Sequence, residues 1–352
     1  MGEGFFVASI LKALDRNYDN SVMSYKTQMA ILSYPIRHEF SKVTNPEIFS
    51  LMSSVSSEDI ENVISKCEGV KLNINEVQRY ALNIPINVGK KFISLSRDPD
   101  TRGIIEAYML YYEFYNLNVL LKARLNGYLE SDLFLFDYHT VVDFGSLLLE
   151  TSVQKIKEGY YKLIEHHKIS FRHLKDLIRT VSSTTINDLL LESSLVYYSN
   201  LIRKYQKVDQ LLRDLVLEKA FYDLLISLAK LKYLSGKNVE EIIQRLTFLS
   251  GKVEILADIF IGDGKEEFIK KCIDNKVIPS TFIVTELDDI VRFRDILLKQ
   301  KCKNIVISLP LNPTSIVAIL MLREIDSRNY LAMVGALLEG FSLDRLRSLL
   351  VL

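Results

Sequence analysis

Proline and cysteine are both scarce in this 352-residue chain, and each scarcity is informative. The chain has 7 prolines, and none of them lies between residues 100 and 278. Because proline breaks helices, this proline-free stretch favours long helices. The 3 cysteines, Cys67, Cys272 and Cys302, are odd in number and far apart in the sequence. Such a pattern is typical of a reducing compartment and not of a disulfide framework.

The chain also lacks an excess of charge and a long apolar run. It has 44 basic and 44 acidic residues, so we expect no nucleic-acid partner. The longest apolar run near the C-terminus, 316–322, is far shorter than the roughly 20 residues of a membrane-spanning helix. The first residues contain no secretory signal, and Phe6 is incompatible with a myristoylation signal. We therefore expect a soluble cytoplasmic protein that associates with membranes only indirectly.

The residue patterns of common catalytic and cofactor sites are missing. Residues 262–265 (GDGK) resemble a phosphate-binding loop only superficially, because such a loop needs a longer spacer and a Ser or Thr after the lysine. His166, His167 and His173 lack the spacing and the acidic partner of a zinc-binding helix. No residue lies in a nucleophile-elbow pattern. We therefore predict no catalytic residue, no cofactor, no metal ligand and no ATP binding.

A short polar motif, with an acidic residue three positions before an asparagine, occurs in two similar stretches. In residues 113–117 (EFYNL) it is followed by Gly127, and in residues 326–330 (DSRNY) it is followed by Gly340. In both copies the glycine lies 11 residues after the asparagine. Glycine adopts the left-handed conformation at a helix end without steric cost. We therefore predict that both helices end at these glycines.

A weaker copy of the motif lies midway between the two. Residues 220–224 (AFYDL) place Asp223 where the other copies have Asn116 and Asn329, and Gly236 follows. Asp223 lies 107 residues after Asn116 and 106 residues before Asn329. Repeats at near-equal spacing indicate a triplicated supersecondary unit. We therefore predict an all-α fold of three pseudo-repeated helical bundles, in residues 1–140, 141–250 and 251–352.

Residues 253–313 admit a second interpretation. Two short runs, 282–285 (FIVT) and 304–309 (NIVISL), have the composition of strands, and residues 286–301 between them have a helical pattern. Short apolar runs cannot be assigned to helix or strand by periodicity alone. A β-α-β fragment, and with it an enzyme built on an α/β segment, stays open at this point.

A basic stretch at 155–179 offers a possible partner surface. It contains seven lysine and arginine residues and three acidic residues. A solvated helix face explains this composition better than a partner-facing patch does. We assign no site to it.

Two segments resemble one protein family. Residues 112–127 (YEFYNLNVLLKARLNG) are similar to the signature of the C subunit of archaeal and bacterial A/V-type ATP synthases, the family whose eukaryotic members are the d subunits of vacuolar ATPases. The tail, 315–352, is similar to the end of that family, with Arg-Glu-x-x-x-Arg-Asn and a final Leu-Arg-x-Leu-Leu-Val. The likeness spans the chain in length and repeat layout, and it is specific at these two helices.

The resemblance implies a funnel of three helical bundles and a non-catalytic role. The protein would belong to the central stalk, where it would couple the central rotor shaft to the membrane proteolipid ring and transmit torque for proton or sodium transport. Its partners would be the other central-stalk proteins and the ring, on the cytoplasmic side of the membrane. The strand-like runs would then be helix or loop. A generic helical-repeat scaffold is the alternative.

The polar residues of the motif copies are the candidate structural or interface residues. Glu324 and Arg328 have the i, i+4 spacing of an ion pair, and Asn329 is unusual inside a helix because its amide competes for backbone hydrogen bonds. These side chains either face water or lie where bundles meet and fix their geometry. The candidates are Glu113, Asn116, Lys122, Arg124, Asp223, Arg323, Glu324, Asp326, Arg328 and Asn329.

The copies depart from one another at several of these positions. The second copy has Ala220 in place of the acidic residue. The third copy has Gly335 and Leu337 where the first has Lys122 and Arg124. A role for the two basic residues of the first copy therefore does not carry over to the third.

Overall fold

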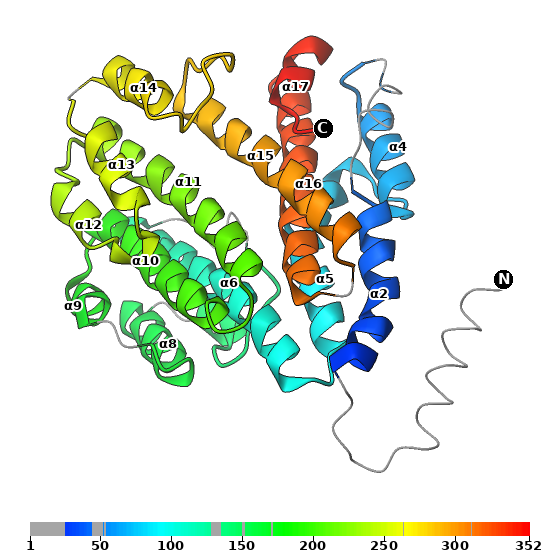
Figure 1. Cartoon of the computed structure of the whole chain (residues 1–352), viewed down its shortest axis with the longest axis horizontal. Helices are drawn as coiled ribbons and strands as arrows, with labels where there is room; N and C mark the ends of the chain where they lie inside the picture. Colours follow the sequence, from blue (N-terminus) through cyan, green and yellow to red (C-terminus); the bar gives the residue numbers. More distant parts are fainter. Residues whose placement is uncertain are drawn as a thin grey trace.

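The computed structural model describes residues 25–43, 52, 54–127, 135–149, 152–169, 172–262, 264–310 and 312–352. All regular secondary structure among these residues is helical, and no strand occurs in them. The prediction of an all-α fold is thus confirmed for this part of the chain. Six long helices form the centre of the molecule (Figure 1): α5 (Ile74–Leu95), α6 (Pro99–Asn126), α10 (Ile186–Tyr205), α11 (Gln210–Ser235), α15 (Leu287–Ser308) and α16 (Pro313–Leu338).

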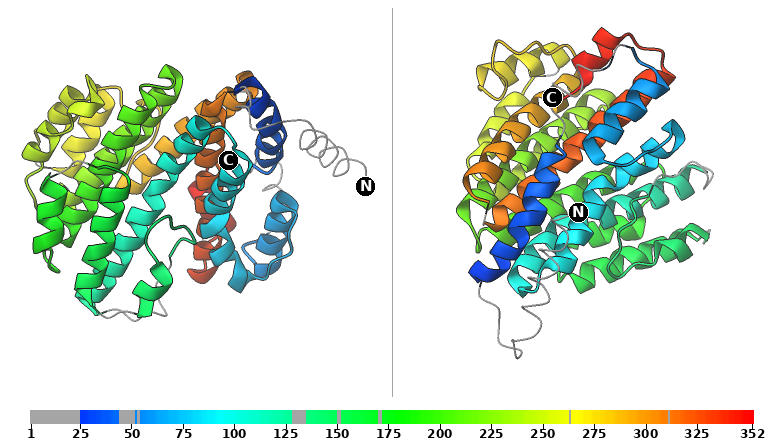
Figure 2. Two further views of the ribbon diagram at one scale, coloured as in Figure 1. Left: turned by 90° about the horizontal axis from the view of Figure 1, so that it is seen from below. Right: turned by 90° about the vertical axis from the view of Figure 1, so that its right-hand side faces the viewer.

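The six central helices pack in chain order, and the last packs against the first. Helix α5 contacts α6, α6 contacts α10, α10 contacts α11, α11 contacts α15, and α15 contacts α16. Helix α16 then packs along α5, and it also touches α6 and α11 across the middle. The result is a closed ring of three helix pairs, α5–α6, α10–α11 and α15–α16, seen from two further sides in Figure 2.

The helix ends follow from capping residues in the sequence. At the start of α6, the Asp98 side chain accepts a hydrogen bond from the Thr101 N–H at 2.7 Å, and Pro99 takes the first helical position. Helices α6 and α11 end one residue before Gly127 and Gly236, and α16 ends two residues before Gly340; these glycines have φ of 72°, 65° and 65°. The predicted ends of the motif helices are therefore confirmed.

Two N-terminal helices flank one side of the ring. Helices α2 (Tyr25–Ser41) and α4 (Ser57–Glu68) both contact α5 and α16, and the short α17 (Leu343–Leu349) folds back onto α16. A second apolar cluster, separate from the main core, fills the space between α4, α5, α16 and α17. The end of α16 is thus buried by the N-terminal helices and by its own tail.

Shorter helices cover the opposite side of the ring (Figure 1). Helices α8 (Val153–His166) and α9 (Arg172–Thr180), which carry the basic stretch, contact α6 and α10 respectively. Helix α9 buries Leu174 and Ile178 on one face, and Arg172 and Arg179 on the rest of its surface are exposed. The remaining helices are α7 (Phe144–Leu149), α12 (Glu240–Gln244), the 3₁₀-helix η2 (Thr247–Leu249), α13 (Lys252–Ile259) and α14 (Lys265–Asp274).

The β-α-β interpretation of 253–313 is wrong. Residues 282–285 form an irregular connection before α15, and 304–308 are the last turns of α15 itself. Within those turns Ile305 and Val306 are buried, whereas Ile307 is 67% exposed. Burial on one helical face explains the apolar residues that look strand-like in the sequence.

Candidate functional site

A polar cavity of about 350 Å³ lies at the centre of the ring. All six central helices contribute to its wall, which makes it the point where the three helix pairs meet. One lining residue from each helix, in chain order, is Leu82, Tyr112, Tyr198, Asp223, Arg294 and Glu324. Three of the candidate residues, Asp223, Glu324 and Arg328, therefore lie around one space.

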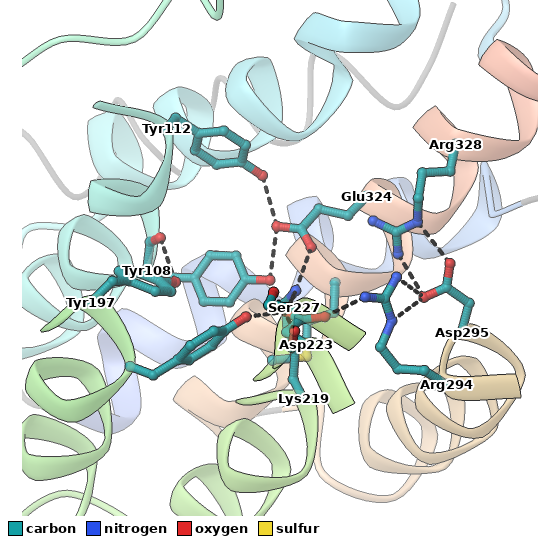
Figure 3. A network of polar contacts seen from close by, with 12 residues as sticks. Tyr108, Tyr112, Tyr197, Lys219, Asp223, Ser227, Arg294, Asp295, Glu324 and Arg328 are labelled. Carbon is teal, nitrogen blue, oxygen red and sulfur yellow. Dashed lines mark hydrogen bonds and ion pairs between the residues drawn. The ribbon is translucent and has the colours of Figure 1, made fainter. Parts of the chain in front are cut away.

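Glu324 of α16 joins the third helix pair to the first and the second. Its Oε1 accepts hydrogen bonds from the hydroxyls of Tyr108 and Tyr112, on α6, at 2.9 and 2.8 Å. Its Oε2 lies 3.5 Å from the ammonium of Lys219, on α11. The pKa of both tyrosines is raised well above the ordinary value, mainly by burial and next by the charge of Glu324. They remain protonated donors, and Figure 3 shows them converging on the carboxylate.

Asp223 of α11 joins the second helix pair to the third. Its carboxylate accepts from the Tyr198 hydroxyl and from the Arg294 guanidinium, and it lies 3.0 Å from the ammonium of Lys219. Burial alone would raise the pKa of Asp223. The charges of Lys219 and Arg294 and the Tyr198 hydrogen bond outweigh that effect and hold the pKa below its ordinary range.

Arg328 pairs with Asp295 and not with Glu324. Its Nε and Nη2 donate to the two carboxylate oxygens of Asp295, on α15, at 2.7 and 2.9 Å. Asp295 also accepts from the Nε of Arg294 at 2.8 Å. The predicted i, i+4 ion pair between Glu324 and Arg328 is therefore wrong: each of these side chains finds a partner on another helix (Figure 3).

Tyrosine hydroxyls link the first helix pair to the second. From α10, Tyr197 donates to the carbonyl oxygen of Tyr108 at 3.0 Å, and Tyr205 donates to that of Ile104 at 2.8 Å. Both tyrosines are buried, and burial raises their pKa well above the ordinary value. The three junctions of the ring are thus closed by three different kinds of polar contact.

Arg323 lies outside the cavity, at the junction with the N-terminal helices. It is 1% exposed, and its Nη2 donates to both carboxylate oxygens of Glu68, on α4, at 2.5 Å. Its Nη1 donates to Asp326 at 2.7 Å. The Glu68 carboxylate also accepts from Tyr80 and Tyr330, each at 3.0 Å. This buried ion pair holds α4 against α16.

Asn116 and Asn329 perform the same task at two places. The side-chain amide of Asn116 donates to the carbonyl of Phe136 and accepts from its N–H, both at 2.8 Å. The amide of Asn329 makes the same two bonds to Val351, both at 2.9 Å. Each asparagine is buried and holds a backbone segment that follows its own helix. We call this arrangement the asparagine clasp.

In the first and third pairs, the first helix also contacts the clasped segment. On α5, Asn83 accepts from the N–H of Asp137, next to the clasped Phe136. On α15, the Lys299 ammonium donates to the Val351 carbonyl at 2.8 Å, and burial lowers the pKa of Lys299 to about 8. Each clasped segment therefore bridges the two helices of its pair.

The remaining candidates of the first copy lie away from the cavity. Glu113 is buried and accepts from the Thr140 hydroxyl at 2.6 Å, and burial raises its pKa in spite of that bond. Arg124 donates to the carbonyl of Leu148 at 2.6 Å. Lys122 is exposed in the groove between α6 and α10. These residues support the loop after α6 or face solvent.

Several residues of the network were missed by sequence reasoning. A local signal exists for Lys219 and Asp223, which have i, i+4 spacing. Arg294 and Asp295 lie in a helix with several other charged residues and do not stand out in the sequence. No local signal connects Arg323 with Glu68, which lies 255 residues earlier. The missed residues are Glu68, Tyr108, Tyr112, Tyr198, Lys219, Arg294 and Asp295.

Side chains of the kinds that bind metals do not gather in the described residues: no group of three His, Cys, Asp or Glu there could hold an ion. Among the described helices, none combines the length and the apolar character needed to span a bilayer. Comparison of the whole chain with protein-family models and with curated proteins finds no match.

Proposed function

We propose that this protein is a non-catalytic central-stalk subunit of a rotary A/V-type ATPase or ATP synthase. It would couple the central rotor shaft to the membrane proteolipid ring as a peripheral protein on the cytoplasmic side. One observation carries the proposal: three helix pairs close a ring around one polar cavity, with a signature helix of the resembled family as the second member of the first and third pairs.

Three equivalent modules, arranged as a funnel, are part of the proposal. Helices α6, α11 and α16 hold the same position in their pairs, and each ends at a left-handed glycine. Asn116 and Asn329 make matching clasps within their pairs. These matches support a repeat in residues 1–140, 141–250 and 251–352, and the central cavity would lie on the funnel axis.

A torque-transmitting protein needs resistance to shear between its parts. Buried polar contacts at every junction of the ring oppose sliding, because displacing one partner leaves the other desolvated and unpaired. Glu324 lies between three helices, and Asp223 binds groups from its own helix and two others. Most polar groups of the network thus pair with one another, which suits a mechanical role.

A generic helical scaffold is the competing function. Helical repeats that serve as scaffolds commonly stack into open superhelices, in which each repeat contacts only its neighbours. Here the first and last helices of the ring pack along each other. Closure favours a socket with one axis over an extended binding surface.

Co-purification tests the proposal. The tagged full-length chain would be mixed with purified central-shaft proteins and a detergent-solubilised proteolipid ring of a rotary ATPase, with an unrelated membrane complex as the control. We expect the chain to be retained by the shaft and by the ring but not by the control complex. We also expect low-salt or chelator washes to release it from native membranes without detergent. Equal retention by the control, or release only by detergent from membranes lacking the ring, would contradict the proposal.

Nucleotide binding provides an independent test of the non-catalytic role. Calorimetric titration of the isolated chain with ATP and magnesium is expected to give no heat of binding in the micromolar range. Magnesium-dependent binding in that range would favour an enzyme instead.

A further inference from the structure

Residues 341–352, which we call the strap, fold back along the end of α16 and include α17 (Figure 1). Only three of its side chains are buried, those of Leu346, Leu350 and Val351. Leu346 and Leu350 belong to the smaller apolar cluster, which is separate from the main core. The charged side chains of the strap are all exposed: Asp344, Arg345 and Arg347. A segment with so few buried contacts can open locally while the ring stays folded.

Polar contacts at Val351 attach the strap to the third helix pair. The Val351 carbonyl accepts from the side-chain amide of Asn329, on α16, at 2.9 Å, and from the ammonium of Lys299, on α15, at 2.8 Å. The Val351 N–H donates to the Asn329 side chain at 2.9 Å. The docked strap therefore ties α15 to α16, and one of its attachments is a titratable group.

Lys299 is buried among groups from three helices and the strap. Its residue is 3% exposed. The titratable groups that act on it are Asp326 on α16, Lys303 on α15 and the thiol of Cys67 on α4. Burial raises the pKa of Cys67 to about 11, so this thiol is neutral near pH 8. Burial also lowers the pKa of Lys299 to about 8, in spite of the attraction of Asp326.

Opening of the strap changes how strongly Lys299 holds its proton. When the strap is open, water reaches the ammonium and its pKa moves back toward the ordinary value of 10.5. The docked state therefore holds this proton less strongly than the open state. Below about pH 8 the ammonium is charged in both states, and docking is weakest. Docking becomes tighter as the pH rises from about 8 toward 10.5, because the docked lysine then loses its proton first.

We propose that the strap is a proton-controlled catch on the third helix pair, docked on α15 and α16 in alkaline solution and released more often when Lys299 is protonated. Release would free α15 and α16 from their shared contact with Val351 and leave the rest of the ring intact. The catch does not depend on the proposed function, because all its parts lie within this chain.

Hydrogen exchange of the full-length chain, followed by mass spectrometry of peptides from the strap, tests the catch. Dividing the exchange rate at each pH by the intrinsic rate at that pH gives the opening equilibrium. We expect the wild-type strap to open roughly three- to tenfold less often at pH 9 than at pH 7. Peptides of α6 and α11 report on the ring and should show no such change.

Substitutions on α15 assign the pH dependence to one side chain. Lys299→Arg stays charged over the whole range and Lys299→Met is never charged, so in both variants the opening equilibrium should be the same at pH 7 and pH 9. Lys301→Met is the matched control. Lys301 is an exposed lysine of the same helix that pairs with Glu218, and this variant should keep the wild-type pH dependence.

Three results would overturn the catch. The first is a wild-type opening equilibrium that is equal at pH 7 and pH 9, and the second is an unchanged pH dependence in Lys299→Arg. The third is an equal change in the strap and in the peptides of the ring, which would indicate a global effect. If Lys299→Arg does not fold, Lys299→Met and the comparison of strap with ring in the wild type decide. None of these results bears on binding to the shaft or to the proteolipid ring, so the proposed function is tested separately.

Discussion

The second signature helix has Asp223 where the first and third have asparagine, and these residues make different contacts. Asn116 and Asn329 each offer a donor and an acceptor, so each can clasp both polar atoms of one backbone residue. Asp223, at the same position, can only accept. It binds a tyrosine, a lysine and an arginine in place of a backbone segment. The asparagines thus clasp a segment within one pair, whereas the aspartate links two pairs.

The difference teaches that helices with similar sequence motifs can have different tasks. The two asparagine copies close their own helix pairs, and the aspartate copy connects the second pair to α15 of the third. The predictions below test this division, from the largest expected effect to the smallest.

The largest effect is expected where the third copy carries a buried ion pair and the first does not. Arg323→Met leaves Glu68 buried without its partner and should lower the free energy of unfolding by about 3–5 kcal/mol. Leu110, at the matching position of α6, is the control, since Leu110→Met should cost less than about 1.5 kcal/mol. Urea unfolding measures both. In the double variant with Glu68→Gln the cost should fall below the sum; equal costs for Arg323→Met and Leu110→Met would refute the prediction.

A smaller effect is expected from converting the clasps to the residue of the second copy. Asn116→Asp and Asn329→Asp each remove a buried donor and place a carboxylate against a backbone carbonyl. We expect each to lower the free energy of unfolding by roughly 1–3 kcal/mol or more. Asn238→Asp is the control, because Asn238 is exposed and its Oδ1 only accepts from a backbone N–H. It should change the free energy of unfolding by less than about 0.5 kcal/mol. Loss of hydrogen-exchange protection at Phe136 or Val351 would locate the damage.

The carboxylate of the second copy should give stability a pH dependence that the asparagines cannot give. The pKa of Asp223 is lowered from 3.8 in the folded protein, so its contribution is present above about pH 4 and is lost as the pH falls through the folded pKa. Asp223→Asn should therefore be less stable than the wild type at pH 6, and the gap should narrow at pH 3 and below. Thermal unfolding across this range measures the gap, and a gap independent of pH would contradict the assignment.

The smallest effect concerns the pairing of Glu324. Because Glu324 faces Lys219 and Arg328 faces Asp295, Glu324→Gln should couple to Lys219→Met more strongly than to Arg328→Met. We expect the second coupling energy to be the smaller of the two in a double-mutant cycle. A larger coupling between Glu324 and Arg328 would restore the intrahelical pair that the sequence suggests.

Much of the fold follows from the sequence by local rules. The proline-free middle predicts long helices, and the glycines after each motif predict their ends, because backbone conformation at these residues depends on the residue itself. The near-equal spacing of Asn116, Asp223 and Asn329 places the three signature helices. The helix lengths and ends depend only on residues that are neighbours in the chain, and the spacing is read directly from the sequence.

The tertiary structure alone decides the partners of the polar residues. Glu324 and Arg328 satisfy the spacing rule for an ion pair on one helix, yet each is bound by side chains of other helices, with Tyr108 lying 216 residues from Glu324. Residues 304–308 look like a strand and become helix because one face packs into the core. Spacing along the chain shows which groups can meet on one helix. Burial decides which of them must find a partner, and the packing of distant helices decides which partner is there.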